Sequence, residues 1–211
     1  MADSFQIIEE HLEKAREKYT SGVHYETLIE ARKEYFEITG QVNEEDDDYE
    51  SRMNAFNDWY LLQFVSRRGT RTVIKEYLTQ NTIEDNVSKS LLTLNHSIFE
   101  FGDMNFSKKL ILKDILHDNK IKLPITHPQL GLIKSDLFIG RVITYNEENY
   151  LLSGLCTLPK QVKSIIAKEC KKIRKLKDPM REVEFLLKLE SLKTKWRRYG
   201  HIDVTKIFIF A

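Results

Sequence analysis

The stretch SDLFIGRVITYNEENYLLSG, residues 135–154, decides the fold class of this chain. Its first half is rich in β-branched and aromatic residues and predicts a strand, and the polar run at 146–149 is typical of a hairpin loop. The second half, which continues to residue 158, predicts a further strand. Gly140 interrupts the first strand and indicates a bulge or a bend at a barrel corner.

The segments upstream of this stretch continue the β pattern. SIFEFGDMNF, KKLILKDIL and NKIKLPI are short, β-rich and separated by turn signals, such as HDN at 117–119. Together these segments predict a small antiparallel β-barrel over residues 96–158, of an SH3-like or an OB-like form.

Residues 1–95 predict helices instead. Apolar or aromatic residues recur at helical spacing in the first of them: Phe5, Ile8, Leu12, Ala15 and Tyr19. The same pattern predicts helices at 4–20 and 23–39, which we expect to form an antiparallel hairpin ending at Gly40. A third helix is predicted at 49–66, where Asp48 is a candidate N-cap, and two short helices are predicted at 71–79 and 82–95.

Residues 159–211 predict a basic helical hairpin with a terminal strand. Asp178 followed by Pro179 is a strong signal for a helix start, with an N-cap and a proline at the first helical position. The apolar run at 206–210 is strand-like and could add to the barrel edge or pack on a partner. The chain is therefore predicted to be an α+β protein with an acidic helical region at 1–95, a barrel at 96–158 and this basic region.

Charge is distributed unevenly along the chain, although the net charge is only +1. Residues 1–60 hold 16 acids and 6 bases, a net charge of −10, and residues 159–198 hold 14 bases and 5 acids, a net charge of +9. These regions could pair within one molecule or between two, or each could face a different partner.

The basic region is a candidate surface for RNA or single-stranded DNA, because cations that neutralise phosphates release counterions. The candidate residues are Lys168, Lys171, Lys172, Arg174, Lys175, Arg197 and Arg198. Trp196 and Tyr199 flank the last two, and aromatic side chains can stack on unpaired bases. The alternative is a solvated helix face whose lysines pair with nearby glutamates.

A second candidate site is the RxxxR spacing of Arg67 and Arg71, which is followed by Asn95, Ser97 and Gly102. These residues resemble the PilZ family, which binds cyclic di-GMP through RxxxR and [DN]xSxxG. The resemblance implies that Arg67 and Arg71 would clamp a cyclic dinucleotide. The glycine stands two positions too late for the second motif.

Residues 54–155 also resemble a set of poorly characterised bacterial proteins that share an FxxW[FY] helical region followed by a β segment. The matching elements are FNDWY, LKDIL and SDLFIGRV. Some related chains end in a cysteine-rich SEC-C zinc motif, whose cysteines are absent here, and Ser135 stands where glycine is usual. The resemblance implies an architecture, and it carries no assigned reaction and no zinc site.

No motif for catalysis or cofactor binding is present: the chain has no GxxxxGK[ST], GxGxxG, HExxH or GxSxG. Asp114, His117 and Asp118 with His127 could approach one another if the strands pair, but a polar hairpin tip is the favoured interpretation. Cys156 lies in an apolar strand and is expected to be a small buried hydrophobe. The run NEEDDD at 43–48 lacks the pattern of a calcium loop. We therefore expect no enzyme, no metal and no cofactor.

The start of the chain has no basic, apolar leader, and no run of 18 apolar residues predicts a membrane span. With two unpaired cysteines, Cys156 and Cys170, these features favour a cytoplasmic protein without membrane insertion.

We expect a non-enzymatic binding or adaptor protein that uses a composite surface of barrel and basic helices. A protein partner is favoured, and RNA or single-stranded DNA and a cyclic dinucleotide are the alternatives. A homo-oligomer could form through the acidic and basic regions or through 206–210.

Overall fold

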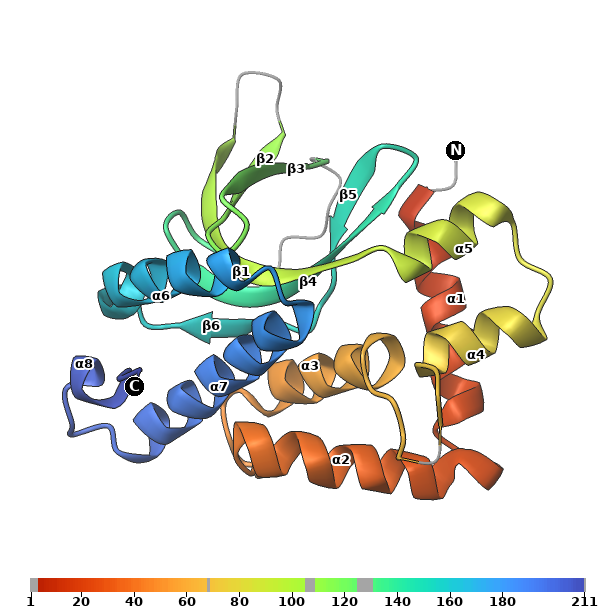
Figure 1. The fold of residues 1–211 in the computed structure, drawn as a ribbon, viewed down its shortest axis with the longest axis horizontal. Helices are drawn as coiled ribbons and strands as arrows, with labels where there is room; N and C mark the ends of the chain where they lie inside the picture. Colours follow the sequence, from red (N-terminus) through yellow and green to blue (C-terminus); the bar gives the residue numbers. More distant parts are fainter. Residues whose placement is uncertain (1–3, 68, 105–108, 125–130, 211) are drawn as a thin grey trace.

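The computed structural model describes residues 4–67, 69–104, 109–124 and 131–210, and it is a mixed structure of helices and one antiparallel sheet (Figure 1). The first helices are α1 (Ser4–Tyr19), α2 (Tyr25–Thr39), α3 (Tyr49–Leu62), α4 (Val73–Gln80) and α5 (Asp85–Leu92). The strands are β1 (Leu94–Met104), β2 (Leu110–Asp114), β3 (Asn119–Leu123), β4 (Leu137–Tyr145), β5 (Glu148–Leu151) and β6 (Cys156–Leu158). The last helices are α6 (Lys163–Leu176), α7 (Pro179–Arg198) and α8 (Val204–Ile207), and short 3-10 turns lie at Gly22–His24 and Lys160–Val162. The predicted α+β class is confirmed.

The sheet has the strand order β3-β2-β1-β4-β5, and β6 also pairs with β4. β4 is its centre: one edge pairs with β1, and the other edge pairs with β6 at 137–139 and with β5 at 142–145. Gly140 stands between the two partners. A Cβ atom there would lie 3.0 Å from Leu155 and 3.1 Å from Leu151, which is closer than ordinary van der Waals contact, so the ends of these side chains would have to shift.

The two predicted hairpin loops are confirmed. Asn146 and Glu147 join β4 to β5 with φ values of 49° and 64°, as in the two-residue turns that match the twist of a hairpin. Asp118, with φ of 60°, lies in the turn between β2 and β3.

The sheet is strongly curled (Figure 1), so its two end strands come close to each other. Asn149 of β5 donates a hydrogen bond from Nδ2 to the carbonyl oxygen of Lys122 on β3 at 3.1 Å. The inner face of this half-barrel holds a core of its own: Phe99, Leu112, Ile121, Leu123, Phe138, Val142, Leu151 and Leu155.

The outer face of the sheet is covered by two groups of helices. Ile143 and Tyr145 of β4 pack into a core with the N-terminal helices, and Leu187 of α7 joins that core. Leu137 and Ile139, earlier on the same strand, pack into a second core with α6, α7 and α8. Because alternate residues of a strand face opposite sides, β4 contributes to all three cores.

Two sequence predictions are wrong. The segment at 206–210 is not a strand: α8 ends at Ile207, and Asp203 caps it by accepting a hydrogen bond from the Thr205 amide at 2.8 Å. The strand prediction rested on the apolar residues of this segment. In the structure they contribute to the core, where Phe208 is 1% exposed. The helices α1 and α2 also do not form an antiparallel hairpin. The chain turns at Gly22, and α2 runs alongside α7 and α3 (Figure 1).

Candidate functional site

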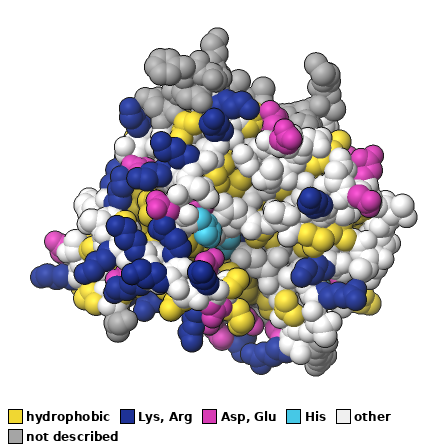
Figure 2. Space-filling view, turned by 45° about the horizontal axis from the view of Figure 1, so that its top comes forward, with side chains coloured by type: hydrophobic (Ala, Val, Ile, Leu, Met, Phe, Trp, Pro, Cys, Tyr) yellow, Lys and Arg dark blue, Asp and Glu magenta, His cyan; other side chains and the backbone are white. Residues whose placement is uncertain are grey.

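The helix α6 carries most of the cations that the sequence singled out. Its apolar residues Ile166, Cys170 and Ile173 face the second core, so its lysines lie on the opposite side. Lys168, Lys171, Lys172 and Lys175 are exposed. In the space-filling view, Lys and Arg side chains gather on the side of the molecule where α6 lies (Figure 2).

Ion pairs fix both ends of α6 to the sheet. Lys163 Nζ lies 2.5 Å from a Glu100 carboxylate oxygen on β1, and Arg174 Nη1 lies 2.9 Å from Asp118 Oδ2 in the turn between β2 and β3. Arg174 also donates a hydrogen bond to the Ile115 carbonyl oxygen at 3.4 Å. Arg174 is therefore a structural contact between α6 and the sheet rather than a free cation.

The sheet adds three exposed lysines on β2 and β3 that sequence reasoning missed. Lys113 on β2 is exposed, pairs in register with Glu100 on one side and with Lys120 on the other, and Lys122 follows on β3. The signal was present in the alternation of lysine and apolar residues along KIKL, since such strands place lysine on one face. We call the exposed set the basic surface: Lys113, Lys120, Lys122, Lys168, Lys171, Lys172 and Lys175.

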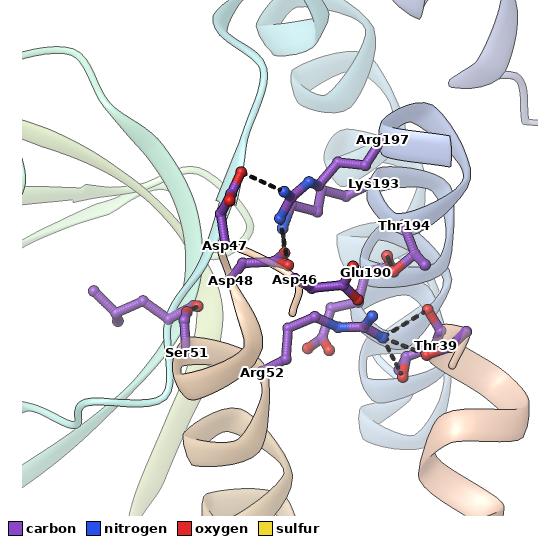
Figure 3. A network of polar contacts seen from close by, with 12 residues as sticks. Thr39, Asp46, Asp47, Asp48, Ser51, Arg52, Glu190, Lys193, Thr194 and Arg197 are labelled. Carbon is purple, nitrogen blue, oxygen red and sulfur yellow. Dashed lines mark hydrogen bonds and ion pairs between the residues drawn. The ribbon is translucent and has the colours of Figure 1, made fainter. Parts of the chain in front are cut away.

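The structure separates Arg197 and Arg198 from this surface. They lie at the C-terminal end of α7, and Figure 3 shows Arg197 against the acidic loop, residues 43–48. Arg197 pairs with Asp47 at 3.0 Å and also with Asp48, and Lys193 pairs with Asp48. Arg198 donates a hydrogen bond to the Gln41 carbonyl oxygen at 3.0 Å. The seven predicted cations are thus divided between two places.

The acidic loop is held in position by Arg52 of α3. This side chain is 7% exposed and donates hydrogen bonds to the carbonyl oxygens of Gln41 at 3.0 Å and Thr39 at 3.3 Å, and also to Gly40 (Figure 3). The arginine thereby satisfies carbonyl groups at and beyond the end of α2, where a helix leaves carbonyls without intrahelical partners. Of the arrangements that the charge distribution left open, pairing within one chain occurs where Asp47 and Asp48 meet Lys193 and Arg197.

A polar cluster occupies the hairpin of β2 and β3. Asp114 is fully buried and accepts hydrogen bonds from Ser97 Oγ at 2.5 Å, Asn95 Nδ2 at 3.0 Å, and the amide and Nδ1 of His117, both at 2.9 Å. Burial opposes ionisation of Asp114, but these hydrogen bonds hold its pKa below the ordinary value. The hydrogen bond with Asp114 in turn raises the pKa of His117. The polar hairpin tip expected from the sequence is a buried, ordered network.

His117 also contacts α7, because its Nε2 atom lies 3.3 Å from Glu182 Oε2. Next to it, His96 is 7% exposed and pairs in register with the fully buried Arg141 of β4. Burial, followed by the positive charge of Arg141, lowers the pKa of His96 far below its ordinary value, so this ring is neutral. Arg141 donates from Nε to Gln63 Oε1 at 2.9 Å.

The two arginines of the RxxxR spacing lie elsewhere, on the connection between α3 and α4. Both are exposed, and Arg67 Nε lies 3.6 Å from a Glu30 carboxylate oxygen. Ser97 of the following motif is committed to Asp114. The cyclic-dinucleotide site stays a prediction.

Cys156 and Cys170 are buried and unpaired, and burial raises the pKa of Cys156 well above its ordinary value, which disfavours the nucleophilic thiolate. Residues 4–67, 69–104, 109–124 and 131–210 contain no group of three or more His, Cys, Asp or Glu arranged to hold a metal ion. His127 lies outside the described residues. Among the helices that the structure describes, none is both long and apolar enough to cross a membrane.

Comparisons with known proteins yield one match. A family model described as "Family of unknown function (DUF7986)" matches residues 3–185. No curated protein and no solved structure matches the chain.

Proposed function

Because the chain belongs to DUF7986, a family of unknown function, we propose its function from the surfaces of its own fold: it binds single-stranded nucleic acid, RNA or DNA, on the basic surface. The mechanism is electrostatic. Lysines of α6, β2 and β3 neutralise successive phosphates and release their counterions, without reading the sequence of bases.

The observation that carries this proposal is that the acidic loop and the basic surface do not meet. The loop pairs with Lys193 and Arg197 on α7. Within the described part of the chain, no carboxylate lies within ion-pair distance of Lys168, Lys171 or Lys175, and Lys172 pairs only with Glu169 of its own helix. A cationic surface that the protein leaves uncovered is available to a polyanion.

The sheet strengthens the proposal, because it widens the surface beyond one helix. Lys113 and Lys120 are directly opposite in the β2–β3 register, where like charges destabilise a strand pair. A partner with negative charge would relieve this repulsion. Whether the half-barrel is SH3-like or OB-like, and whether α6 and α7 form the predicted hairpin, stay predictions.

A protein partner remains the alternative function, as does an adaptor role in the cytoplasm. Its sequence candidate was an open strand at 206–210, but α8 ends at Ile207 and Phe208 is buried, so this segment is not a strand. Exposed apolar side chains near the connection between α6 and α7, Leu176 and Met180, are 58% and 73% exposed and are the surface that a protein partner would use.

Binding of labelled single-stranded RNA and DNA 20-mers, followed by fluorescence anisotropy between 50 and 200 mM KCl, tests the proposal. The variant Lys168→Glu/Lys171→Glu/Lys175→Glu should weaken binding at least about tenfold and reduce the slope of log K against log[salt] by about 2, since each lost phosphate contact contributes about 0.7 on single strands.

A matched control is Lys14→Glu/Lys33→Glu/Lys75→Glu, which makes the same change of charge at exposed positions of α1, α2 and α4. It should bind within about threefold of the wild type. No binding by the wild-type protein at 50 mM KCl, or equal losses in the two triple variants, would refute the proposal. Comparison of the RNA and DNA 20-mers shows which of the two nucleic acids the protein prefers.

A further inference from the structure

A cavity of about 500 Å³ opens beside the basic surface, between the β2–β3 hairpin, the start of β1 and the start of α7. The hairpin contributes His117 and Asn119 to the wall of the cavity, and the first turn of α7 contributes Pro179 and Glu182. Lys120 follows Asn119 directly along β3, so the cavity and the basic surface adjoin. In Figure 2 the histidine side chains lie in the middle of the face, next to the gathered Lys and Arg side chains.

Two residues that line this cavity, Asn95 and His96, carry buried polar atoms without hydrogen-bond partners in the part of the chain that the structure describes. Neither ring nitrogen of His96 has a hydrogen-bond partner among the residues that the structure describes, although the residue is 7% exposed. The Oδ1 atom of Asn95 is likewise buried without a partner, while its Nδ2 atom is held by Asp114. Buried polar groups are normally hydrogen-bonded, so these atoms point to a ligand.

The unpartnered atoms define what the ligand must offer. Asn95 Oδ1 accepts a hydrogen bond and therefore requires an N–H or O–H group. The neutral imidazole of His96 has one donor and one acceptor, which the edge of a heterocycle can match. Gln63 adds a further amide to the lining.

The remaining walls are apolar and come from α3, α5, β1 and α7. They comprise Leu62, Leu92, Leu94, Val183 and Leu186. The carboxylate of Glu182, which also lines the cavity, would repel a phosphate, and the apolar walls offer a phosphate no hydrogen bonds. The cavity thus accepts a planar, uncharged group better than it accepts a phosphate.

We propose that this cavity binds one unpaired nucleobase of the strand whose phosphates follow the basic surface. The inference rests on the proposed function and adds a base-binding pocket to it. Apolar side chains contact the faces of the base, and Asn95 and His96 bind its edge, as proteins that take up splayed-out bases of single strands do.

Two variants separate the pocket from the fold. His96→Leu keeps the size of the side chain and removes its polar atoms, so the protein should melt at the same or a higher temperature while it loses the base. Leu92→Trp places a larger side chain at the rim, where Leu92 is 49% exposed and its replacement costs little core packing. Ile29→Trp, at a position on α2 that is 44% exposed, is the matched control for the added tryptophan.

The experiment compares two labelled single strands in fluorescence anisotropy at 50 mM KCl: a deoxyadenosine 12-mer, and a 12-mer of abasic tetrahydrofuran units with the same phosphates. Wild-type protein and Ile29→Trp should bind the deoxyadenosine strand about tenfold more tightly. His96→Leu and Leu92→Trp should bind both strands with equal affinity.

Each failure has a distinct meaning. If the wild-type protein binds the two strands equally, or if both pocket variants keep the preference for bases, the base pocket is refuted. Binding of the phosphates by the basic surface is then still supported. If neither strand binds to the wild-type protein, the proposed function fails for DNA and the pocket inference falls with it.

Discussion

At the scale of single residues, Asp114 orders the β2–β3 hairpin. It accepts hydrogen bonds from Asn95 and Ser97 of β1 and from His117 beyond β2, with no solvent exposure. Charge-assisted hydrogen bonds of this kind are shorter and stronger than neutral ones. The ring of His117 is therefore fixed between Asp114 and Glu182, and its protonation links the hairpin to α7.

This arrangement predicts a pH dependence of stability. The pKa of His117 is raised above its ordinary value of 6.5 when the protein folds. Its stabilising effect is therefore complete below pH 6.5 and is lost as the pH rises through the raised pKa. His117→Gln should lower the free energy of unfolding by about 1 kcal/mol more at pH 6 than at pH 8.5, measured by urea denaturation.

His201→Gln is the control for this measurement, because His201 is exposed near the end of the chain. It should change the free energy of unfolding equally at both pH values. A loss in His117→Gln that is the same at pH 6 and pH 8.5 would mean that the neutral ring, rather than the imidazolium, makes these contacts.

At the scale of secondary-structure elements, two helix starts that look alike in the sequence differ in the structure. Asp178 caps α7, because its Oδ1 accepts a hydrogen bond from the Met180 amide at 2.9 Å. Asp48 precedes α3 but makes no side-chain capping bond, since its carboxylate pairs with Lys193 and Arg197. An aspartate at a helix start thus caps the helix unless a distant cation takes its oxygens.

Replacing each aspartate by asparagine tests this difference. Asparagine is an equally good N-cap, so Asp178→Asn should change the free energy of unfolding by less than about 0.5 kcal/mol. Asp48→Asn should lower it by about 2 kcal/mol, because Lys193 is 7% exposed and would lose its partner. Urea denaturation of both variants provides the measurement, and equal losses would show that the ion pairs of Asp48 with Lys193 and Arg197 do not stabilise the fold.

Helices and strands whose form follows from the spacing of apolar residues could be predicted from the sequence. Segments whose form depends on contacts with distant parts of the chain could not. The strand at 137–145 and its turn with φ values of 49° and 64° follow from local sequence. The segment at 206–210 has the composition of a strand, but burial of Phe208 against helices decided its form, and that contact is remote in sequence.

The candidate site shows the same limit. The lysines of α6 were predicted, because one helix face can be read from spacing. The separation of Arg197 from them was not, since it depends on where the acidic loop lies in space. The unpartnered atoms of His96 depend on the register of β1 with β4, which sequence alone does not give.

At the scale of the whole molecule, the sheet is the common support of the cores. Its outer face contributes Ile143 to the core of the N-terminal helices and Ile139 to that of the C-terminal helices, and its inner face holds the third core. A small domain with one face of its sheet uncovered exposes too much apolar surface to be stable.

The segment at 96–158, which the sequence predicts as a separate barrel, should therefore not fold alone. A fragment of these residues should show no cooperative thermal transition by circular dichroism, whereas the full chain should show one. A cooperative transition in the isolated fragment would establish the three separate regions that the sequence predicts.

The contact between α2 and α7 has a consequence for synthesis of the protein. Tyr35 donates a hydrogen bond to Glu190 Oε2 at 2.5 Å across 155 positions of sequence. At ribosomal rates of about 5–20 residues per second, the nascent chain would wait about 8–30 s between the two residues. During that interval the aromatic faces of α2 and α3 stay unshielded, so the emerging chain is a natural client for chaperones until α7 leaves the exit tunnel.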